Sequence, residues 1–501
     1  MSSGNFITSG GQLRSVAMER NALHLLKSMK AADANTCSRI DAQHCSTTLN
    51  MFAEQTYRRH CAFAVATHYE AFDNAPRTNE RWTSSRVLKA PVRSGHILLK
   101  AFVHAQVEAL RVKSAPSTLS TSTSHVAWVN DLGNAMVQSA EFKHRNVSLQ
   151  KHDSISLRIL AAERNDSADA EMRADFESPL LGAQKRISDR ARVFAAMRRN
   201  VFTDLHFFSG SVSDGMPLMC TNGSAVVEVE VRLRPWVDLV RCLDATSPAY
   251  VSDTVIDADI EGGTLNAINL VYVSVYLDTT ALSVASQALV RTPRRYQFIK
   301  AVMDERPVVA NDSGTGQLAF DLHAPVSRYS IVYRRNGAIG SGTPKSYFDF
   351  SSVVPDAALP VPLRAATLPN TYWPCDPIEY AAIAYDNVVA GYGSGEQLRL
   401  LSNYVAQSGS SRPRQGATDH YVYTVPVSMA RCDDGQFVDS DRFGEHGVHC
   451  VTNKTVEIGW RSTNAAQNGV AASGLWFVYA HCQNEYVLDE VNNLMSVWAS
   501  Y

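Results

Sequence analysis

The sequence has 501 residues, of which 45% are hydrophobic and 19% are charged, with a formal net charge of −2 and a pI near 6.7. This near-neutral balance excludes binding of nucleic acid through the net charge of the whole chain. The composition is typical of globular proteins rather than of disordered ones. The length indicates two to four domains or two large β domains. Nine cysteines without a C-x-x-C pair, and an opening without an apolar signal segment, lead us to expect reduced thiols and cytosolic synthesis.

Residues 1–49 differ in pattern from the rest of the chain. Apolar residues recur there at roughly helical spacing, namely Leu13, Val16, Ala17, Leu23, Leu26 and Met29. The stripe is weak, so the segment is interpreted as a partly helical N-terminal arm, with a disordered tail as the alternative.

After residue 49 the hydrophobic period changes from near 3.6 to 2, which is typical of β-strands. In "AVVEVEVRLRPW" the residues Val227, Val229 and Val231 fall on one face, and Glu228 and Glu230 fall on the other. The segments "SISLRIL", "VYVSVYL", "YVYTVPVSM" and "TVEIGW" repeat the alternation, and turn-rich pieces separate them. Many strands with such spacing predict an all-β sandwich or barrel.

The sequence also suggests where the chain divides. One internal helix is predicted over residues 182–200, and an acidic, turn-rich segment at 242–263 indicates a break between halves. The expected organisation is an arm at 1–49, a first β domain at 50–245 and a second at 246–501. No internal sequence repeat is visible between the two halves.

The segment "FAEQTYRRHCAFAV", residues 52–65, sets two arginines and a histidine inside an apolar, aromatic run. With "ATHYEAF" after it, the segment resembles the first-strand signature of major capsid proteins of large nucleocytoplasmic DNA viruses. Cys61 stands where that family usually has threonine. The matching residues are Phe52, Tyr57, Arg58, Arg59, His60, Phe63, Ala64 and Phe72.

Weaker, collinear matches follow in the family's order over about residues 50–500. They include Gly133, Pro217, Leu218, Glu228 and Glu230. The chain departs from the family pattern at His96, which replaces an aspartate. It also lacks the Glu-Arg pair of "LVYVSVYLDTTALSVAS", residues 270–286, which resembles the strand that opens the family's second half.

The resemblance implies an all-β double jelly roll, with two eight-stranded antiparallel barrels in one chain. It also implies a structural protein without catalytic residues, metal or cofactor. Three chains would form a homotrimeric, pseudo-hexagonal capsomer of an icosahedral virion shell, made in the host cytoplasm. The implied partners are copies of the chain, minor capsid or cement proteins, and through these an inner viral membrane, with no direct nucleic acid contact.

Within this interpretation the arginine pair has an ordering role. Strand alternation places Tyr57 and Arg59 on one face and Arg58 and His60 on the other, so at most one guanidinium points into a core, where we expect it to be paired. We therefore expect Arg59→Ala to give insoluble or single-chain protein.

Two other functions stay open from the sequence. A double jelly-roll scaffold that transiently coats an assembling virion membrane has the same pattern. A carbohydrate-binding or glycan-processing two-barrel protein would show a clustered acid pair in a cleft. A zinc site at Cys432, His446, His449 and Cys450 is a further possibility, although the spacing fits no common zinc finger.

Overall fold

The computed structural model describes residues 63–77, 80–114, 124–129, 131–144, 147–163, 198–207, 216–218, 227–244, 251–252, 259–279, 281–283, 294–308, 314–320, 326–335, 347–348, 350, 352–355, 372–375, 377–385, 388–398, 421–426, 454–460 and 474–488. The chain divides into a small unit, residues 1–64 with 276–287, and a large unit, residues 65–275 with 288–501. The expected arm at 1–49 lies outside the described residues, as do residues 182–197 of the expected helix. Residues 199–200, which close that expected helix, belong to a strand instead.

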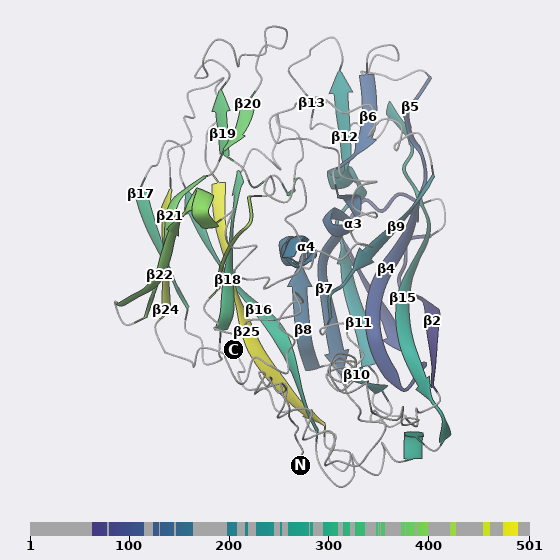
Figure 1. The fold of residues 1–501 in the computed structure, drawn as a ribbon. Helices are drawn as coiled ribbons and strands as arrows, with labels where there is room; N and C mark the ends of the chain where they lie inside the picture. The colour runs from purple at the N-terminus through teal and green to yellow at the C-terminus, as the bar shows by residue number, and fades with distance from the viewer. Residues whose placement is uncertain are drawn as a thin grey trace, which may run out of the picture. The chain divides into compact units, whose positions relative to one another are not determined.

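The main sheets of the first half of the chain are one of five strands and one of four strands, and their strands are labelled in Figure 1. One sheet holds β2 (Phe63–Ala71), β15 (Leu265–Leu277), β4 (Ile97–Val107) and β9 (Arg199–Asp204) in this order, and the short β10 (Met216–Pro217) also pairs with β4. The other holds β3 (Arg86–Val92), β11 (Val227–Leu233), β7 (Val137–His144) and β8 (Val147–Asp153) in this order.

The expected alternation is confirmed in β11. Val227, Val229, Val231 and Leu233 are buried, whereas the residues between them are half-buried or exposed. The strand pairs antiparallel with β3 on one side and β7 on the other, so it is a central strand of its sheet. Its apolar side faces the core.

The strand order is that of a jelly roll when the eight main strands are lettered B to I in chain order. Strands β2, β15, β4 and β9 are B, I, D and G, and strands β3, β11, β7 and β8 are C, H, E and F. We call these eight strands the first barrel, its two sheets the BIDG and CHEF sheets, and the corresponding strands of the second half the second barrel.

The second barrel has the same order. Its BIDG sheet holds β16 (Arg294–Val308), β25 (Gly474–Leu488), β18 (Val326–Arg335) and β23 (Tyr423–Pro426). Its CHEF sheet holds β17 (Gly314–Phe320), β24 (Lys454–Trp460), β21 (Ile378–Tyr385) and β22 (Val388–Ser394). The fold is therefore duplicated within the chain although the sequence shows no repeat.

Short elements complete the described structure. They are β5 (Leu110–Val112), β6 (Ser124–Trp128), β12 (Val240–Asp244), β13 (Val251–Ser252), β14 (Ile260–Gly262), β19 (Ser352–Pro355), β20 (Tyr372–Cys375), the helices α3 (Leu132–Met136) and α4 (Ser154–Glu163), and the 3-10 helix η5 (Trp236–Leu239).

The strand pairing does not follow the division expected at residue 245. Strand β14 pairs with β5, and β15 pairs with β4 over Leu265 to Val275, so both continue sheets begun earlier in the chain. Strand β15 had been expected to open the second half, yet it is strand I of the first barrel. An alternating apolar run shows that a strand exists but not which partner it takes, and this explains the difference.

The segment "SISLRIL" is a helix, and the strand expected there is wrong. Ser154 to Leu160 are all buried in α4, so this part of the helix has no solvent-exposed side. Leu157 packs in the core of the first barrel, whereas Ile155 and Ile159 pack in the core of the second. A helix that is buried on all sides lacks a 3.6-residue stripe, and alternation then imitates a strand.

Candidate functional site

The predicted motif residues are only partly described. Phe52, Tyr57, Arg58, Arg59 and His60 lie outside the described residues. Phe63 is the first residue of β2 and is 65% exposed. The structure therefore describes the end of the motif, and the roles of the two arginines stay predictions.

Gly133 lies in α3, where the helix passes close to β9. A Cβ atom built on Gly133 would be 2.6 Å from Thr203 Oγ1 and 3.2 Å from a methyl group of Val201. Contacts below about 3 Å require the neighbour to move, so the absence of a side chain permits this packing. The geometry at Gly133 therefore indicates a packing role.

The other predicted residues do not converge on one point. Pro217 of β10 pairs with Ile97 of β4. Glu228 and Glu230 lie on the outer side of β11. Glu230 accepts a hydrogen bond from Lys143 Nζ at 2.9 Å and lies 3.4 Å from Lys89 Nζ.

These contacts determine the titration of Glu230. Burial opposes ionisation, but the hydrogen bonds and charges of Lys143 and Lys89 outweigh it and hold the pKa of Glu230 below its usual value. In turn, the hydrogen bond to Glu230 raises the pKa of Lys143. The group is an ion-pair network across three strands of the CHEF sheet.

The residues that sequence reasoning missed form the contact between the two barrels, which we call the seam. Asp153 is the last residue of β8 and caps α4, because its Oδ1 accepts the Ser156 N–H at 2.8 Å. Its Oδ2 accepts the Tyr479 hydroxyl of β25 at 2.8 Å, which joins the first barrel to the second. Burial raises the pKa of Asp153 above its usual value, against the opposing effect of these hydrogen bonds.

Arginines flank this contact on the first-barrel side. Arg158 of α4 is buried and lies 3.3 Å from Asp131 Oδ2, and its guanidinium stands 6.0 Å from the ring of Phe348. Asn134 also donates to both carboxylate oxygens of Asp131, at 3.1 and 2.9 Å. The buried charges are thus paired, and one of them reaches an aromatic residue of the later half.

Arg234 links the same region to Tyr347. Its Nε donates to Ala135 O at 2.9 Å, and its guanidinium lies 4.4 Å from the Tyr347 ring. The Tyr347 hydroxyl donates to Asp238 O at 2.8 Å. Apolar packing, charge and hydrogen bonds therefore all hold the seam together.

The two outer faces of the first barrel differ in chemistry. The CHEF sheet carries alternating charges, which we call the charged face, made of Lys89, Glu141, Lys143, Glu228, Glu230 and Arg232. The outer side of the BIDG sheet is largely aromatic, and we call its residues Val65, Tyr69, Phe102, His104, Phe202 and Asn269 the aromatic face. Lys100 and the buried Asp204 lie on the same side, next to Phe102.

The aromatic face is ordered by side-chain contacts. His104 stacks on Phe202 with ring centroids 4.6 Å apart, and Tyr69 meets His104 edge-on at 6.3 Å. Phe202, Val65 and Tyr69 are 37%, 55% and 62% exposed, so the face presents apolar surface to solvent in the single chain.

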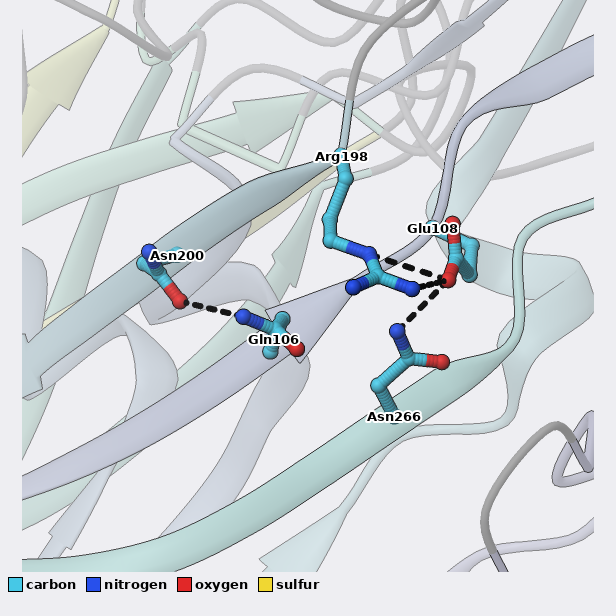
Figure 2. A network of polar contacts seen from close by, with 5 residues as sticks. All are labelled: Gln106, Glu108, Arg198, Asn200 and Asn266. Atoms are coloured by element: carbon cyan, nitrogen blue, oxygen red, sulfur yellow. Dashed lines mark hydrogen bonds and ion pairs between the residues drawn. The ribbon is translucent and has the colours of Figure 1, made fainter.

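Polar groups border one end of this face, and Figure 2 shows the contacts among them. Arg198 forms an ion pair with Glu108, and Asn266 donates to the same carboxylate oxygen at 2.5 Å. Nearby, Gln106 donates to Asn200 Oδ1 at 3.1 Å. The hydrogen bond from Arg198 is the main cause that lowers the pKa of Glu108.

Within the described ranges, no group of three or more His, Cys, Asp or Glu side chains could hold a metal ion. The candidate zinc ligands near residues 432–450 lie outside those ranges. None of the helices that the structure describes combines the length and the apolar composition that crossing a membrane requires.

Comparison with solved structures identifies the fold. The chain is similar to VP54 of PBCV-1, with a TM-score of 0.61 and 12% identity over 90% of this chain and 100% of that one. It is equally similar to the Faustovirus major capsid protein, with a TM-score of 0.61 and 10% identity over 96% and 100% of the two chains. The fold is a double jelly roll.

A third double jelly roll, from the Sputnik virophage structure, has a TM-score of 0.55 and 8% identity over 91% of this chain and 92% of that one. No family model matches the sequence, and no curated protein matches it. The likeness therefore lies in the fold, since few residues are identical.

Proposed function

We propose that this chain is a major capsid protein of a large icosahedral DNA virus and has a structural, non-enzymatic role. The observation that carries the proposal is the tandem of two barrels with the same strand order, joined by a buried seam, in a fold shared with viral major capsid proteins. A rigid pair of barrels is a suitable tile for a shell, because three such pairs form six similar lobes around a three-fold axis.

The proposed assembly is a homotrimeric, pseudo-hexagonal capsomer in the outer shell of the virion. Obligate interfaces of this kind bury on the order of 2,000 Å² or more, and the exposed aromatic face offers apolar surface for such a contact. Minor capsid or cement proteins would bind the inner side, and the chain would be made in the host cytoplasm. The near-neutral net charge supports a shell that does not touch the genome.

Two finer proposals accompany this function. The domain division is placed between β15 and β16, at residues 278–293, because every main strand before it pairs within the first barrel and every one after it within the second. Arg58 and Arg59 are proposed to order the start of the first barrel, and Arg59→Ala is expected to yield insoluble or single-chain protein.

Size-exclusion chromatography with light scattering on the purified full chain tests the proposal. We expect a mass of about three chains that does not change on dilution, followed by hexagonal arrays in electron micrographs at high concentration. A single-chain mass at every concentration, with the β fold intact by circular dichroism, would refute the capsomer.

A further inference from the structure

The duplication within the chain allows the two BIDG sheets to be compared directly. In the second barrel the outer side of this sheet is covered: Phe477, Tyr479, His481 and Ser330 are at most 4% exposed. The end of β8 and the start of α4 contribute to this cover, because Asp153 binds Tyr479 and two isoleucines of α4 join the second core. In the first barrel the corresponding side is the exposed aromatic face.

The covering element is duplicated as well. Strand F of the first barrel ends at Asp153, whose side chain accepts the N–H of Ser156, three residues later. Strand F of the second barrel ends at Ser394, whose Oγ accepts the N–H of Gln397, also three residues later, at 3.2 Å. Both strands thus continue into a helical turn that is capped by the last strand residue.

The second copy of this element is partly exposed. Residues 395–398 form one helical turn, and Glu396 and Gln397 are exposed in the single chain. The first copy is buried in the seam. Each chain therefore has one BIDG sheet and one F-strand turn that meet each other. The other BIDG sheet keeps apolar side chains exposed, and the other turn keeps Glu396 and Gln397 exposed while Leu398 packs against the second core.

We infer that the aromatic face of one chain binds the end of β22 and the turn 395–398 of a second copy, so that the contact between chains repeats the seam within each chain. This inference rests on the proposed capsomer and names the surfaces that build it. Such a contact is head-to-tail, and a head-to-tail contact generates a closed ring when the rotation between subunits permits closure.

The chemistry of the first barrel supports a copy of this chain as the occupant. The charged face of the CHEF sheet has the salt bridges of a solvated surface, including Lys143 with Glu230 at 2.9 Å. On the aromatic face, charges stand at Lys100, at the pair Arg198 and Glu108, and at the buried Asp204 beside His206, while the row of Asn269, His104 and Phe202 holds no carboxylate, lysine or arginine. An apolar centre depleted of charge within a polar rim is the anatomy of a protein interface.

The test places a charge on the aromatic face at Phe202, in the edge strand β9, where the ring stacks on His104. Phe202→Glu is compared with Arg232→Glu, a larger charge change at an exposed position of the charged face in the same barrel. We expect the first variant to raise the concentration at which half of the trimers dissociate by about 30-fold or more, as for an interface hot spot, and the second to leave it unchanged. Tyr69→Glu is the second variant if Phe202→Glu does not fold.

Hydrogen exchange identifies the occupant. Relative to the wild-type trimer, the dissociated variant should exchange faster both at residues 63–71 and at residues 388–398, with no change at residues 227–233. A three-chain wild type whose variants also keep three chains would overturn this inference and leave the capsomer standing. Faster exchange at 63–71 alone would show that another segment covers the face, and would also overturn it. A wild type that is always a single chain would instead refute the proposed function.

Discussion

Removal of the Asp153 carboxylate is the most informative perturbation of the seam. Asp153→Ala deletes the N-cap of α4, which costs about 0.5–2 kcal/mol. It also leaves the Tyr479 hydroxyl without this acceptor in a buried position, which costs about 1–3 kcal/mol more. The free energy of unfolding should therefore fall by about 2–4 kcal/mol.

The duplicated cap provides a matched control. Ser394→Ala removes the equivalent cap after β22, at an end where the capping pair is exposed, so it should cost about 0.5–2 kcal/mol. Both variants are measured by urea unfolding at one protein concentration, since assembly is linked to stability.

A double-mutant cycle with Tyr479→Phe isolates the bond across the seam. We expect a coupling energy between Asp153 and Tyr479 of about 1 kcal/mol or more. If Asp153→Ala costs no more than Ser394→Ala, and the cycle shows no coupling, then the hydrogen bond does not hold the barrels together and the account of the seam is wrong.

Three further predictions concern other buried or charged groups. Burial, with Arg328 and His152 nearby, holds the pKa of His481 well below 6.5. Because the unfolded chain then binds the proton more readily, the free energy of unfolding should fall by up to about 1.4 kcal/mol per pH unit as the pH drops below 6.5. In His481→Gln the midpoint of urea unfolding should depend less steeply on pH. Gly133→Ala should cost about 1–3 kcal/mol in the same assay through overpacking against Thr203, unlike alanine at an exposed strand position. Glu230→Gln should cost under about 1 kcal/mol, with the difference reduced in 1 M salt.

The sequence predicted the features that depend on one strand alone. The alternation of β11 identified its buried valines, because in a strand with one buried side every second residue faces the core and is apolar. The pairing of Glu230 with Lys143 could not be predicted in this way, because it depends on the register between β11 and β7.

The seam was missed because its signal is local and short. Asp153 before an apolar run is an N-cap pattern, and attention to it could have revealed α4 where alternation indicated a strand. The strand pairing could not be predicted either, since only the partner of β15 distinguishes the last strand of one barrel from the first of the next. The duplication is a property of strand order, which diverged residues do not reveal.

The shared helix α4 has a consequence for how the chain is made on the ribosome. Ile155 and Ile159 belong to the core of the second barrel, whose last buried strand includes Cys482. At about 5–20 residues per second, roughly 15–65 s pass between synthesis of the helix and synthesis of that strand. The nascent first barrel must therefore carry these isoleucines without their partners in the second core for that time.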